Sequence, residues 1–469
     1  MSTQGNRDFR PFCHYTPPAG WINDPNGLLW EDGVWHLFAQ HNPSEPFWGN
    51  MHWRHATSTD LIHWEDRGLA LKPDGLGMVY SGSAVIDRGN TSGLGKDGVD
   101  PMILIYTSHG AFEQQCIAWS LDRVHFTPYE GNPVIPNHEK RDFRDPKVFR
   151  NERLGCWSMI LAAGKAFEFY ASDDLIHWRK TGEFGREAFR PGGIAECPDL
   201  FPLPAPDGSA VWVLTGSVAN DPAYGGGRMV YFLGEFDGCT FREILPKPWP
   251  RILDHGWDDY AAVTFANTDR RLMMGWAQSP VYANEEPTGS YCCNMTYARE
   301  LSLTETEEGL ALAMKPVTPR FRLSPAGILP SPEKEDGYFQ PDPVSEGILP
   351  DELFRIHVEA EGHFRLTLSN EGGEKLVITL DTEQRLVVDR TEAGQKDFSP
   401  AFASGLMSVV TAKRKKAGAM MMDLYFDRML AEIFADDGTL AITTAVFPKA
   451  PYTKAQLLGR GTMQIGTAG

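Results

Sequence analysis

The sequence predicts an all-β fold in which a five-bladed β-propeller is followed by a C-terminal β-sandwich. Long amphipathic helical patterns are nearly absent from its 469 residues, and short apolar runs alternate with Gly, Pro, Asn and Asp. A seven-residue phrase also recurs, as Ser58–Trp64 and again as Ser172–Trp178, each time after a strand-like run. A repeat of about 50–60 residues with four short strands is typical of a propeller blade.

Two looser copies of the phrase, Ser120–Phe126 and Phe236–Phe241, extend the same repeat. The aromatic residues that end the four copies are separated by 62, 52 and 63 residues. The chain from residue 10 to about residue 300 therefore has room for five blades, and we expect the propeller to occupy residues 1–315. In a propeller the innermost strands meet around a central funnel, where side chains distant in sequence converge.

A change in composition predicts where the propeller ends. Seven prolines lie between positions 316 and 343 among Gly and acidic residues, so residues 316–347 are interpreted as a linker-like stretch. Alternating apolar runs return beyond it, for example at Phe364–Ser369 and Lys375–Leu380, without the repeat phrase. These runs predict a β-sandwich over residues 348–469.

Charge and cysteine usage exclude several classes of partner. The formal net charge of −18 argues against nucleic acid and anionic membranes and favours a neutral or cationic ligand over a polyanion. No apolar run is long enough to span a bilayer, and Met1–Asp8 lacks the apolar region of a secretory signal. Seven scattered cysteines without CxxC spacing predict reduced thiols rather than disulfides or a zinc site. We therefore expect a cytoplasmic protein without a metal or cofactor; no feature of the sequence assigns an oligomeric state.

The stretch Trp21–Gly27, which reads Trp-Ile-Asn-Asp-Pro-Asn-Gly, is the first candidate for a functional site. Pro25 fixes its own φ and disfavours the helical region for Asp24, while Asn26-Gly27 favours positive φ. The sequence therefore predicts a stiff turn that opens the first hairpin and holds a carboxylate in place. Taken alone, the same residues are more typical of an ordinary Asx-turn.

Two later stretches also carry acids. In Asp142–Lys147, Arg144 is expected to keep the neighbouring Asp145 ionised. In Ala195–Phe201, Glu196 has apolar neighbours in sequence, and apolar surroundings favour a protonated carboxyl. One ionised and one protonated acid is what glycoside hydrolysis requires. The three stretches are separated by about 121 and 51 residues, which places them on different blades; each acid taken singly fits a turn or a surface ion pair.

Together these stretches resemble family 32 of the glycoside hydrolases, which comprises invertases, exo-inulinases, levanases and sucrose-6-phosphate hydrolases. Trp21–Gly27 is similar to the family's nucleophile motif, with Ile22 where Met is usual. Phe143–Pro146 resembles the motif of its transition-state stabiliser, and Glu196–Asp199 the motif of its acid/base residue. The resemblance covers nearly the whole chain and implies the same order of propeller and sandwich.

Shorter matches imply contacts to a fructosyl ring. Tyr80–Ser83, Phe38–Pro43, Asp254–Ala261 and Gly275-Trp276 resemble family segments. Residues 277–280 depart from the Asn residues usual in the family, and Met429-Leu430 replace its usual Ser residues in the C-terminal domain, to which we assign packing and no catalytic role. The substrate-binding residues that the resemblance implies are Asn23, Gln40, Trp48, Ser81, Arg144, Tyr260 and Trp276.

The resemblance implies a retaining β-fructofuranosidase acting on sucrose and short fructo-oligosaccharides, with no cofactor. Asp24 would be the nucleophile, Glu196 the acid/base and Asp145 the transition-state stabiliser, with the Asp24 and Glu196 carboxyls about 5–5.5 Å apart. Hydrolysis of sucrose 6-phosphate and fructosyl transfer are alternatives within the family. Outside it remain a non-catalytic carbohydrate-binding propeller and a protein-interaction propeller, although the Gly-His and Trp-Asp signatures of the latter are absent.

Overall fold

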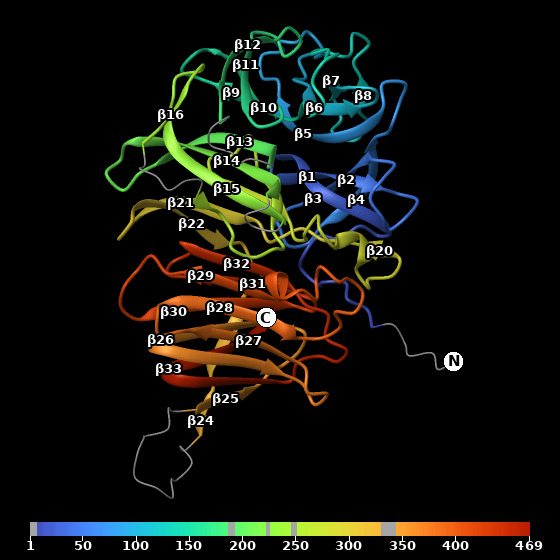
Figure 1. The fold of residues 1–469 in the computed structure, drawn as a ribbon. Helices are drawn as coiled ribbons and strands as arrows, with labels where there is room; N and C mark the ends of the chain where they lie inside the picture. The colour runs from blue at the N-terminus through green and yellow to red at the C-terminus, as the bar shows by residue number, and fades with distance from the viewer. Residues whose placement is uncertain (1–6, 186–192, 222–225, 245–250, 330–343) are drawn as a thin grey trace, which may run out of the picture.

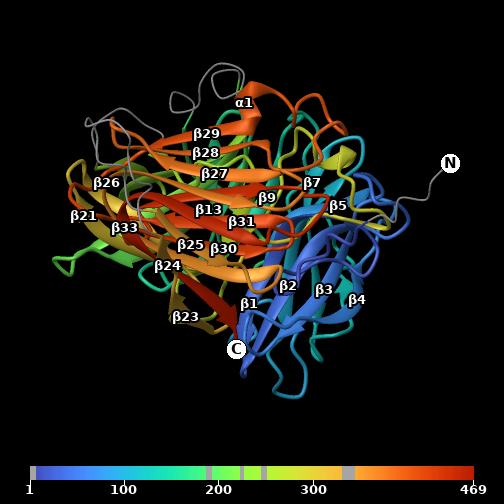
Figure 2. The ribbon, with the colours of Figure 1, turned by 90° about the horizontal axis from the view of Figure 1, so that it is seen from below.

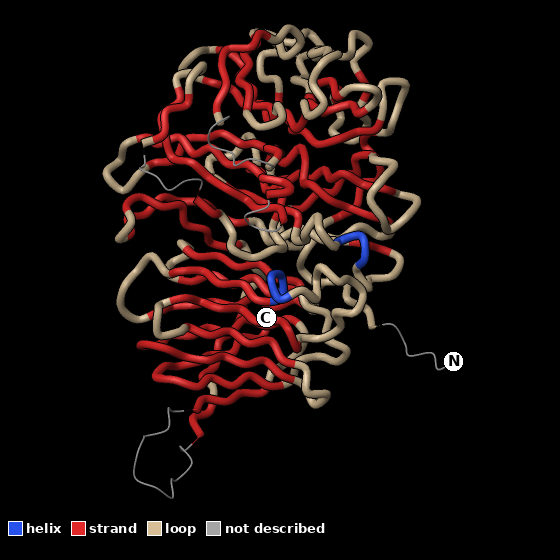
Figure 3. The backbone as a smooth tube through the Cα atoms, viewed as in Figure 1, coloured by secondary structure: helices blue, strands red, loops and turns tan. Residues whose placement is uncertain are grey.

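Nearly all regular structure in the protein is β-strand, as the sequence predicts (Figure 3). The computed structural model describes residues 7–185, 193–221, 226–244, 251–329 and 344–469. Helical structure in this part of the chain is confined to η1 (Ala283–Glu285) and α1 (Gly405–Ser408). No helix found there has the length and apolar character needed to cross a membrane.

Five antiparallel sheets of four strands form the N-terminal domain and lie around a common centre (Figure 1). The strands of the first three blades are β1 (Gly20–Glu31), β2 (Val34–Asn42), β3 (His52–Ser58), β4 (Glu65–Leu71), β5 (Met78–Ile86), β6 (Met102–His109), β7 (Glu113–Ser120), β8 (Thr127–Pro128), β9 (Arg144–Asn151), β10 (Cys156–Ala162), β11 (Phe167–Ser172) and β12 (Arg179–Phe184). Those of the last two are β13 (Ile194–Pro204), β14 (Ala210–Asp221), β15 (Gly226–Phe236), β16 (Phe241–Glu243), β18 (Tyr260–Thr264), β19 (Leu272–Trp276), β21 (Arg299–Thr306) and β22 (Gly309–Pro316).

The innermost strands β1, β5, β9, β13 and β18 form a closed ring. Each contacts the next, and β1 contacts β18 to complete the circle. Two short strands sit outside this pattern: β17 (Arg251–Ile252) pairs with β15, and β20 (Tyr291–Cys292) runs parallel to the start of β1. The predicted five-bladed propeller is thereby confirmed.

The recurring phrase forms the same turn in three blades, between the third and fourth strands. Its serine hydroxyl (Ser58 in the first copy) accepts the backbone N–H three residues later, at 2.8–2.9 Å. Its aspartate (Asp60) accepts the backbone N–H of the histidine (His63) at 2.7–2.8 Å and contacts the ring at 2.7 Å. In the fainter fourth copy Asp237 accepts two backbone N–H groups between β15 and β16. The turn depends on local hydrogen bonds, so its sequence marks each blade.

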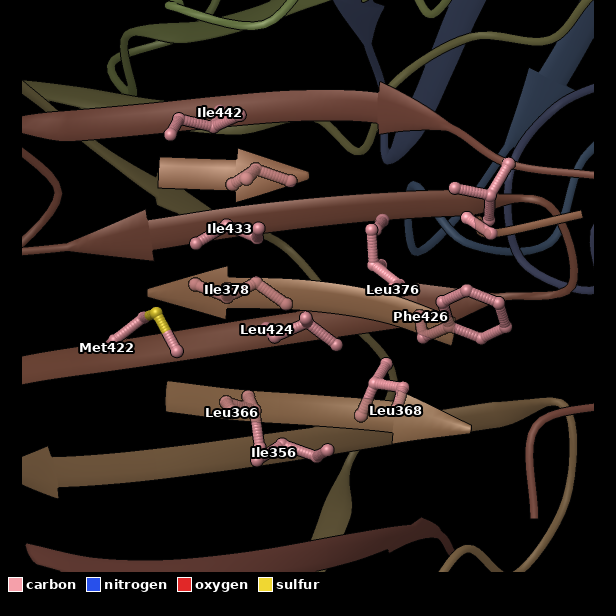
Figure 4. Close-up of a cluster of buried hydrophobic side chains, with 14 of the residues drawn as sticks. Ile356, Leu366, Leu368, Leu376, Ile378, Met422, Leu424, Phe426, Ile433 and Ile442 are labelled. Atoms are coloured by element: carbon pink, nitrogen blue, oxygen red, sulfur yellow. The ribbon is translucent and has the colours of Figure 1, made fainter. Parts of the chain in front are cut away.

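The C-terminal domain is the predicted sandwich, and in the view from below it lies in front of the propeller (Figure 2). The long strands pass between its two layers: residues 353–360 of β26 pair with β30, and residues 364–369 pair with β27. Apolar side chains from both layers fill the space between them (Figure 4). Its strands are β23 (Phe321–Pro325), β24 (Gly327–Leu329), β25 (Val344–Ile348), β26 (Leu353–Ser369), β27 (Lys375–Leu380), β28 (Arg385–Glu392), β29 (Val409–Lys413), β30 (Met420–Asp427), β31 (Leu430–Ala435), β32 (Leu440–Ala445) and β33 (Lys454–Ala468).

Part of the stretch interpreted as linker-like belongs to the C-terminal sheet. Strand β23 pairs with β33, and β24 pairs with β25, so residues 321–325 and 327–329 carry regular ladders despite their prolines. Pro325 lies at the end of β23, where a missing N–H is tolerated. Pro330, Pro332, Pro341 and Pro343 lie outside the described residues.

The N-terminal segment joins the two domains. Phe9 packs in the core of the C-terminal domain, and the backbone N–H groups of Phe12 and Cys13 donate to Asp427 at 2.8 Å. His14 lies between Asp427 and Glu432, at 2.8 and 3.1 Å. Burial alone lowers the pKa of His14, but the two acids raise it to about 9, so the ring is charged at neutral pH. Asp427 and Glu432 of the C-terminal domain thus anchor residues 12–14.

Arg299 forms the centre of the domain interface. Its guanidinium donates to Glu432 of β31 at 2.7 and 3.0 Å and to Thr443 of β32 at 2.7 Å. On the propeller side it donates to Asp254 at 3.0 Å and to Asp259 at 2.9 Å. All four charged side chains are at most 2% exposed. Because Asp259 directly precedes β18, this network ties an innermost strand to the sandwich.

Candidate active site

Each innermost strand carries an extra residue where the predicted site residues lie. At these points the pairing with the second strand slips by one residue, which is a β-bulge; bulges bend a strand and redirect its side chains. The backbone is left-handed at three of them, with φ of 65° at Asp145, 44° at Cys197 and 54° at Ala261. The slips fall at Asn23–Asp24, Ser81, Asp145–Pro146, Cys197–Pro198 and Ala261–Ala262.

The stretch Trp21–Gly27 is not the predicted turn. It lies inside β1, and the first hairpin turns at residues 32–33 instead. A second slip between Asn26 and Leu29 absorbs the conformation of Gly27, whose φ is 52°. A Cβ at Gly27 would lie 2.5 Å from the ring of Phe38, so glycine is required there. Bulges rather than a turn therefore hold Asp24.

Donors from four strands fix the carboxylate of Asp24. Asn23 donates to one oxygen at 2.9 Å. The other oxygen accepts from Gln40 of β2 at 3.0 Å, from the hydroxyl of Ser81 of β5 at 2.5 Å, and from the thiol of Cys197 of β13 at 3.5 Å. Burial raises the pKa of the Cys197 thiol well above its ordinary value, so the thiol remains a donor. The structure thus brings Asn23, Gln40 and Ser81, which the resemblance assigns to the substrate, together on Asp24.

Asp145 is buried beside Asp24. Its Oδ2 accepts the backbone N–H of Cys197 at 2.9 Å and lies 3.6 Å from the Cys197 thiol. Burial, reinforced by the charges of Asp24 and Glu196, raises the pKa of Asp145 to about 8, although the charge of Arg144 opposes this. The expectation that Arg144 keeps Asp145 ionised is therefore wrong, because desolvation of the carboxyl outweighs the charge of the neighbouring cation.

The Asp145→Asn variant is expected to gain stability relative to the parent protein as pH rises. The folded-state pKa of about 8 lies above the ordinary value of 3.8, so folding disfavours the carboxylate. This cost is absent below pH 4, grows between pH 4 and pH 8 and is constant above. We expect the difference in Tm between Asp145→Asn and the parent to grow over that range. Thermal unfolding from pH 4 to 9 measures it; a difference independent of pH would contradict the buried assignment.

Glu196 is surrounded by polar donors, which contradicts the apolar environment expected from its sequence neighbours. Arg144 donates to Oε1 at 2.8 Å, and the hydroxyl of Tyr260 donates to Oε2 at 2.6 Å. Burial, together with the charge of Glu196, raises the pKa of Tyr260 well above its ordinary value, so its hydroxyl stays protonated. Arg144 reaches Glu196 from β9 and Tyr260 from β18, so residues remote in sequence supply what sequence neighbours do not.

The two predicted tryptophans lie at the border of this cluster. The ring of Trp276 is 5.6 Å from that of Trp21, whose indole N–H donates to Asn23 at 2.8 Å. Trp48 is 48% exposed, and its ring is 6.1 Å from Tyr80, the residue before Ser81. Within the described part of the chain, neither tryptophan side chain hydrogen-bonds to Asp24, Asp145 or Glu196.

Sequence reasoning missed two members of the site. Cys197 contacts both Asp24 and Asp145, and its place inside the Glu-Cys-Pro-Asp motif was the signal. Glu113 accepts from Arg144 at 3.1 Å and from the backbone N–H of Phe143 at 2.7 Å. No sequence signal marks Glu113, because it is 31 residues from its partner on the start of another strand.

One cluster has the composition of a metal site. Glu286, Cys292 and Cys293 place possible ligand atoms within 4.8 Å of one another. The thiol of Cys292 donates to the carbonyl of Ala283 at 3.2 Å, and burial raises the pKa of Cys293 well above its ordinary value. Metals bind the thiolate, so this cluster is a poor ligand set as it stands. The carboxylates of Asp24, Asp145 and Glu196 are held by hydrogen bonds from protein donors.

Comparisons with known proteins agree with this geometry. The family model "Glycosyl hydrolases family 32 N-terminal domain" matches residues 14–316, and "Glycosyl hydrolases family 32 C terminal" matches residues 351–467. A levanase of Bacillus subtilis (strain 168) is 38% identical over 467 residues, which cover 95% of this chain and 68% of the relative. The extracellular exo-inulinase inuE of Aspergillus niger is 32% identical over 500 residues, which cover 97% and 93%.

Solved structures show the same fold. The exo-inulinase from Aspergillus awamori superposes with a TM-score of 0.87 and 28% identity over 99% of both chains. A β-fructofuranosidase from Schwanniomyces occidentalis, complexed with fructosyl-erythritol, gives a TM-score of 0.87 and 26% identity over 99% of both chains. With both of its domains matched, the chain belongs to glycosyl hydrolase family 32 and is a glycoside hydrolase.

Proposed function

We propose that the protein is a retaining β-fructofuranosidase that removes the terminal non-reducing β-D-fructofuranosyl unit of sucrose and short fructo-oligosaccharides. One observation carries the proposal: Asp24, Asp145 and Glu196 come from three blades and meet around Cys197. The Cys197 thiol lies 3.5 Å from Asp24 and 3.6 Å from Asp145, and Glu196 is its neighbour in the chain. A levanase, exo-inulinases and a β-fructofuranosidase among the similar proteins support this class of substrate.

In the first step Asp24 attacks the anomeric carbon C2 of the fructosyl unit, and the bond from C2 to the glycosidic oxygen breaks. Glu196 donates a proton to that oxygen, so the leaving sugar departs neutral. The donors around Asp24 hold the attacking carboxylate in one orientation, which lowers the entropic cost of attack. Asp145 binds sugar hydroxyls and stabilises the oxocarbenium-like transition state.

In the second step water attacks C2 of the fructosyl ester and releases Asp24. Glu196, now a carboxylate, removes the proton from this water. Arg144 and Tyr260 hold Glu196 in place for both roles, since each binds a different oxygen of its carboxyl group. Two inversions at C2 leave the β configuration unchanged, which requires the Asp24 and Glu196 carboxyls to be about 5–5.5 Å apart.

Removal of terminal units from levan or inulin is a second candidate, favoured by the names of the similar proteins. Hydrolysis of sucrose 6-phosphate and transfer of fructose to another sugar use the same three acids. Real-time proton NMR with sucrose, kestose, levan and sucrose 6-phosphate separates these cases. We expect β-fructofuranose to appear first from sucrose and kestose, before its mutarotated forms; initial release of the α-anomer would overturn the retaining mechanism.

Substituting Glu196→Gln is expected to lower kcat for sucrose by about 10²–10⁴, the usual contribution of general acid–base catalysis. The glutamine is of similar size and still meets Arg144 and Tyr260, but it cannot transfer a proton. Bond cleavage should suffer less with p-nitrophenyl β-fructofuranoside, whose leaving group needs little protonation. Sodium azide should then restore turnover by replacing water, giving a fructosyl azide of β configuration. Equal losses on both substrates, with no effect of azide, would contradict the acid/base role.

A further inference from the structure

A cavity lies toward the far ends of β5, β9 and β13, away from the site residues Ser81, Asp145 and Glu196. It has a volume of about 880 Å³ and is lined mainly by the later residues of β5, β9 and β13, by residues 264–269 and by Arg271. Ser81, Asp145 and Glu196 lie nearer the starts of the same strands. The cavity is therefore separate from the site at Asp24, and its volume suits a small organic ligand.

Two cations share a single carboxylate at the base of this cavity. Lys147 of β9 is buried and lies 3.1 Å from Asp199 of β13. Arg271 is also near Asp199: its burial lowers the pKa of its guanidinium, and the charge of Asp199 only partly offsets this. Burial is also the main cause that lowers the pKa of Lys147, and the positive charge of Arg271 adds to it. The base of the cavity thus carries one more positive than negative charge.

Arg271 is partly buried and has few partners for a guanidinium in such a position. Among the described residues its recorded side-chain contact is with the ring of Phe201, 5.0 Å from the guanidinium carbon, and no hydrogen bond or ion pair of its five N–H donors is found. The adjacent Arg270 instead faces outward and pairs with Glu300 at 2.9 Å. A partly buried cation with unused donors stands to gain most from an oxyanion.

The walls add two further features. Arg88, Arg150 and Arg153 lie at the exposed rim, where Glu152 and Asp269 only partly balance them. The rings of Phe149 and Trp212, 5.9 Å apart, form an apolar wall. The lining of the cavity is therefore more basic than the chain as a whole, whose net charge is −18. Such a chain does not attract anions by its overall charge.

From these contacts we propose that the cavity binds a small phosphate-bearing anion, with the phosphate oxygens accepting hydrogen bonds from Arg271 at the base. Phosphate is favoured because the planar guanidinium matches two of its oxygens. Inorganic phosphate and a phosphate ester share this chemistry. The aromatic wall offers an ester an additional contact that inorganic phosphate does not use.

Isothermal titration calorimetry at constant ionic strength, kept with sodium chloride, tests the site. The probes are inorganic phosphate and glycerol 3-phosphate. This ester has no furanosyl ring, so it offers nothing for the proposed sugar site at Asp24 to bind. We expect one saturable site in the parent protein and in Arg270→Leu, and binding weakened about tenfold or more in Arg271→Leu. Arg271→Lys keeps the charge without the planar fork and should bind between the two, which provides a second test if the leucine variant does not fold.

The hydrolysis of sucrose monitors folding, because Arg271 lies away from the acids; its rate is expected to be unchanged in both leucine variants. Stronger binding of glycerol 3-phosphate than of phosphate would assign the site to esters, and equal binding would assign it to the phosphate group alone. Absence of saturable binding in the parent protein would overturn the proposal. Equal weakening in Arg270→Leu and Arg271→Leu would do the same, since it would indicate a diffuse charge effect.

Discussion

The Asp24→Asn variant is expected to bind sucrose but to hydrolyse it more slowly by about four powers of ten or more, the scale on which loss of a covalent nucleophile acts. The amide oxygen can still accept from Gln40 and Ser81 while the amide NH2 gives up the bond from Asn23, so we expect the fold and most ground-state contacts to be kept. It cannot form the ester with C2. Initial rates with sucrose, together with mass spectrometry of the protein trapped with a slow substrate, measure the effect.

The matched control for this prediction is Gln40→Leu. Gln40 donates to Asp24 and to Ser81, at 3.0 and 2.5 Å, and therefore orients the nucleophile without reacting. We expect its removal to cost about tenfold to a hundredfold in kcat, well below the loss for Asp24→Asn, while a fructosyl ester still forms. Loss of the ester in Gln40→Leu together with its retention in Asp24→Asn would refute the assignment of the nucleophile.

The Arg299→Met variant is expected to show the largest loss of stability, about 3–5 kcal/mol in the free energy of unfolding. Methionine fills similar space but leaves Asp254, Asp259 and Glu432 without their shared cation inside the domain interface. Burial already raises the pKa of Asp259 to about 8 despite Arg299, so removal of the cation should raise it further and increase the loss at alkaline pH. Urea unfolding at pH 6 and pH 9 measures both effects.

Arg270→Met is the control for Arg299→Met. It breaks the ion pair between Arg270 and Glu300, and Glu300 directly follows Arg299 in β21. Arg270 and Glu300 are 46% and 42% exposed, and such surface pairs contribute at most about 1 kcal/mol. We expect its unfolding curve to stay close to that of the parent. Comparable losses in both variants would mean that burial of the Arg299 network contributes nothing specific.

The propeller was predictable because its signal is local. The serine, aspartate and histidine of each repeat hydrogen-bond within six residues, so their sequence alone specifies the turn that ends the third strand. The stretch from residue 316 was harder to interpret. Pro316, Pro319 and Pro325 suggest a linker by composition, yet β23, which ends at Pro325, pairs with β33, the last strand of the chain. Partners so distant leave no trace in local composition.

The sequence singles out Asp24, Asp145 and Glu196 as candidates, but it does not predict which side chains surround them. Arg144 was expected to act on its neighbour Asp145, whereas the structure directs it to Glu113 and Glu196, 31 and 52 residues away. Likewise Ala195 and Leu200 pack in the propeller core, while the carboxyl of Glu196 meets Tyr260 from another blade. Proximity in sequence fails here because the bulges turn successive side chains in unrelated directions.

The bulges at the start of the innermost strands also separate chemistry from architecture. In three blades the second and third strands pair without interruption: β2 with β3, β6 with β7, and β10 with β11. The irregular backbone that places the acids thus lies on the innermost strands, whereas the second and third strands form a regular frame that adds single side chains such as Gln40 and Glu113. A one-residue deletion within a bulge would displace one of the proposed catalytic groups and leave the frame of the blade intact.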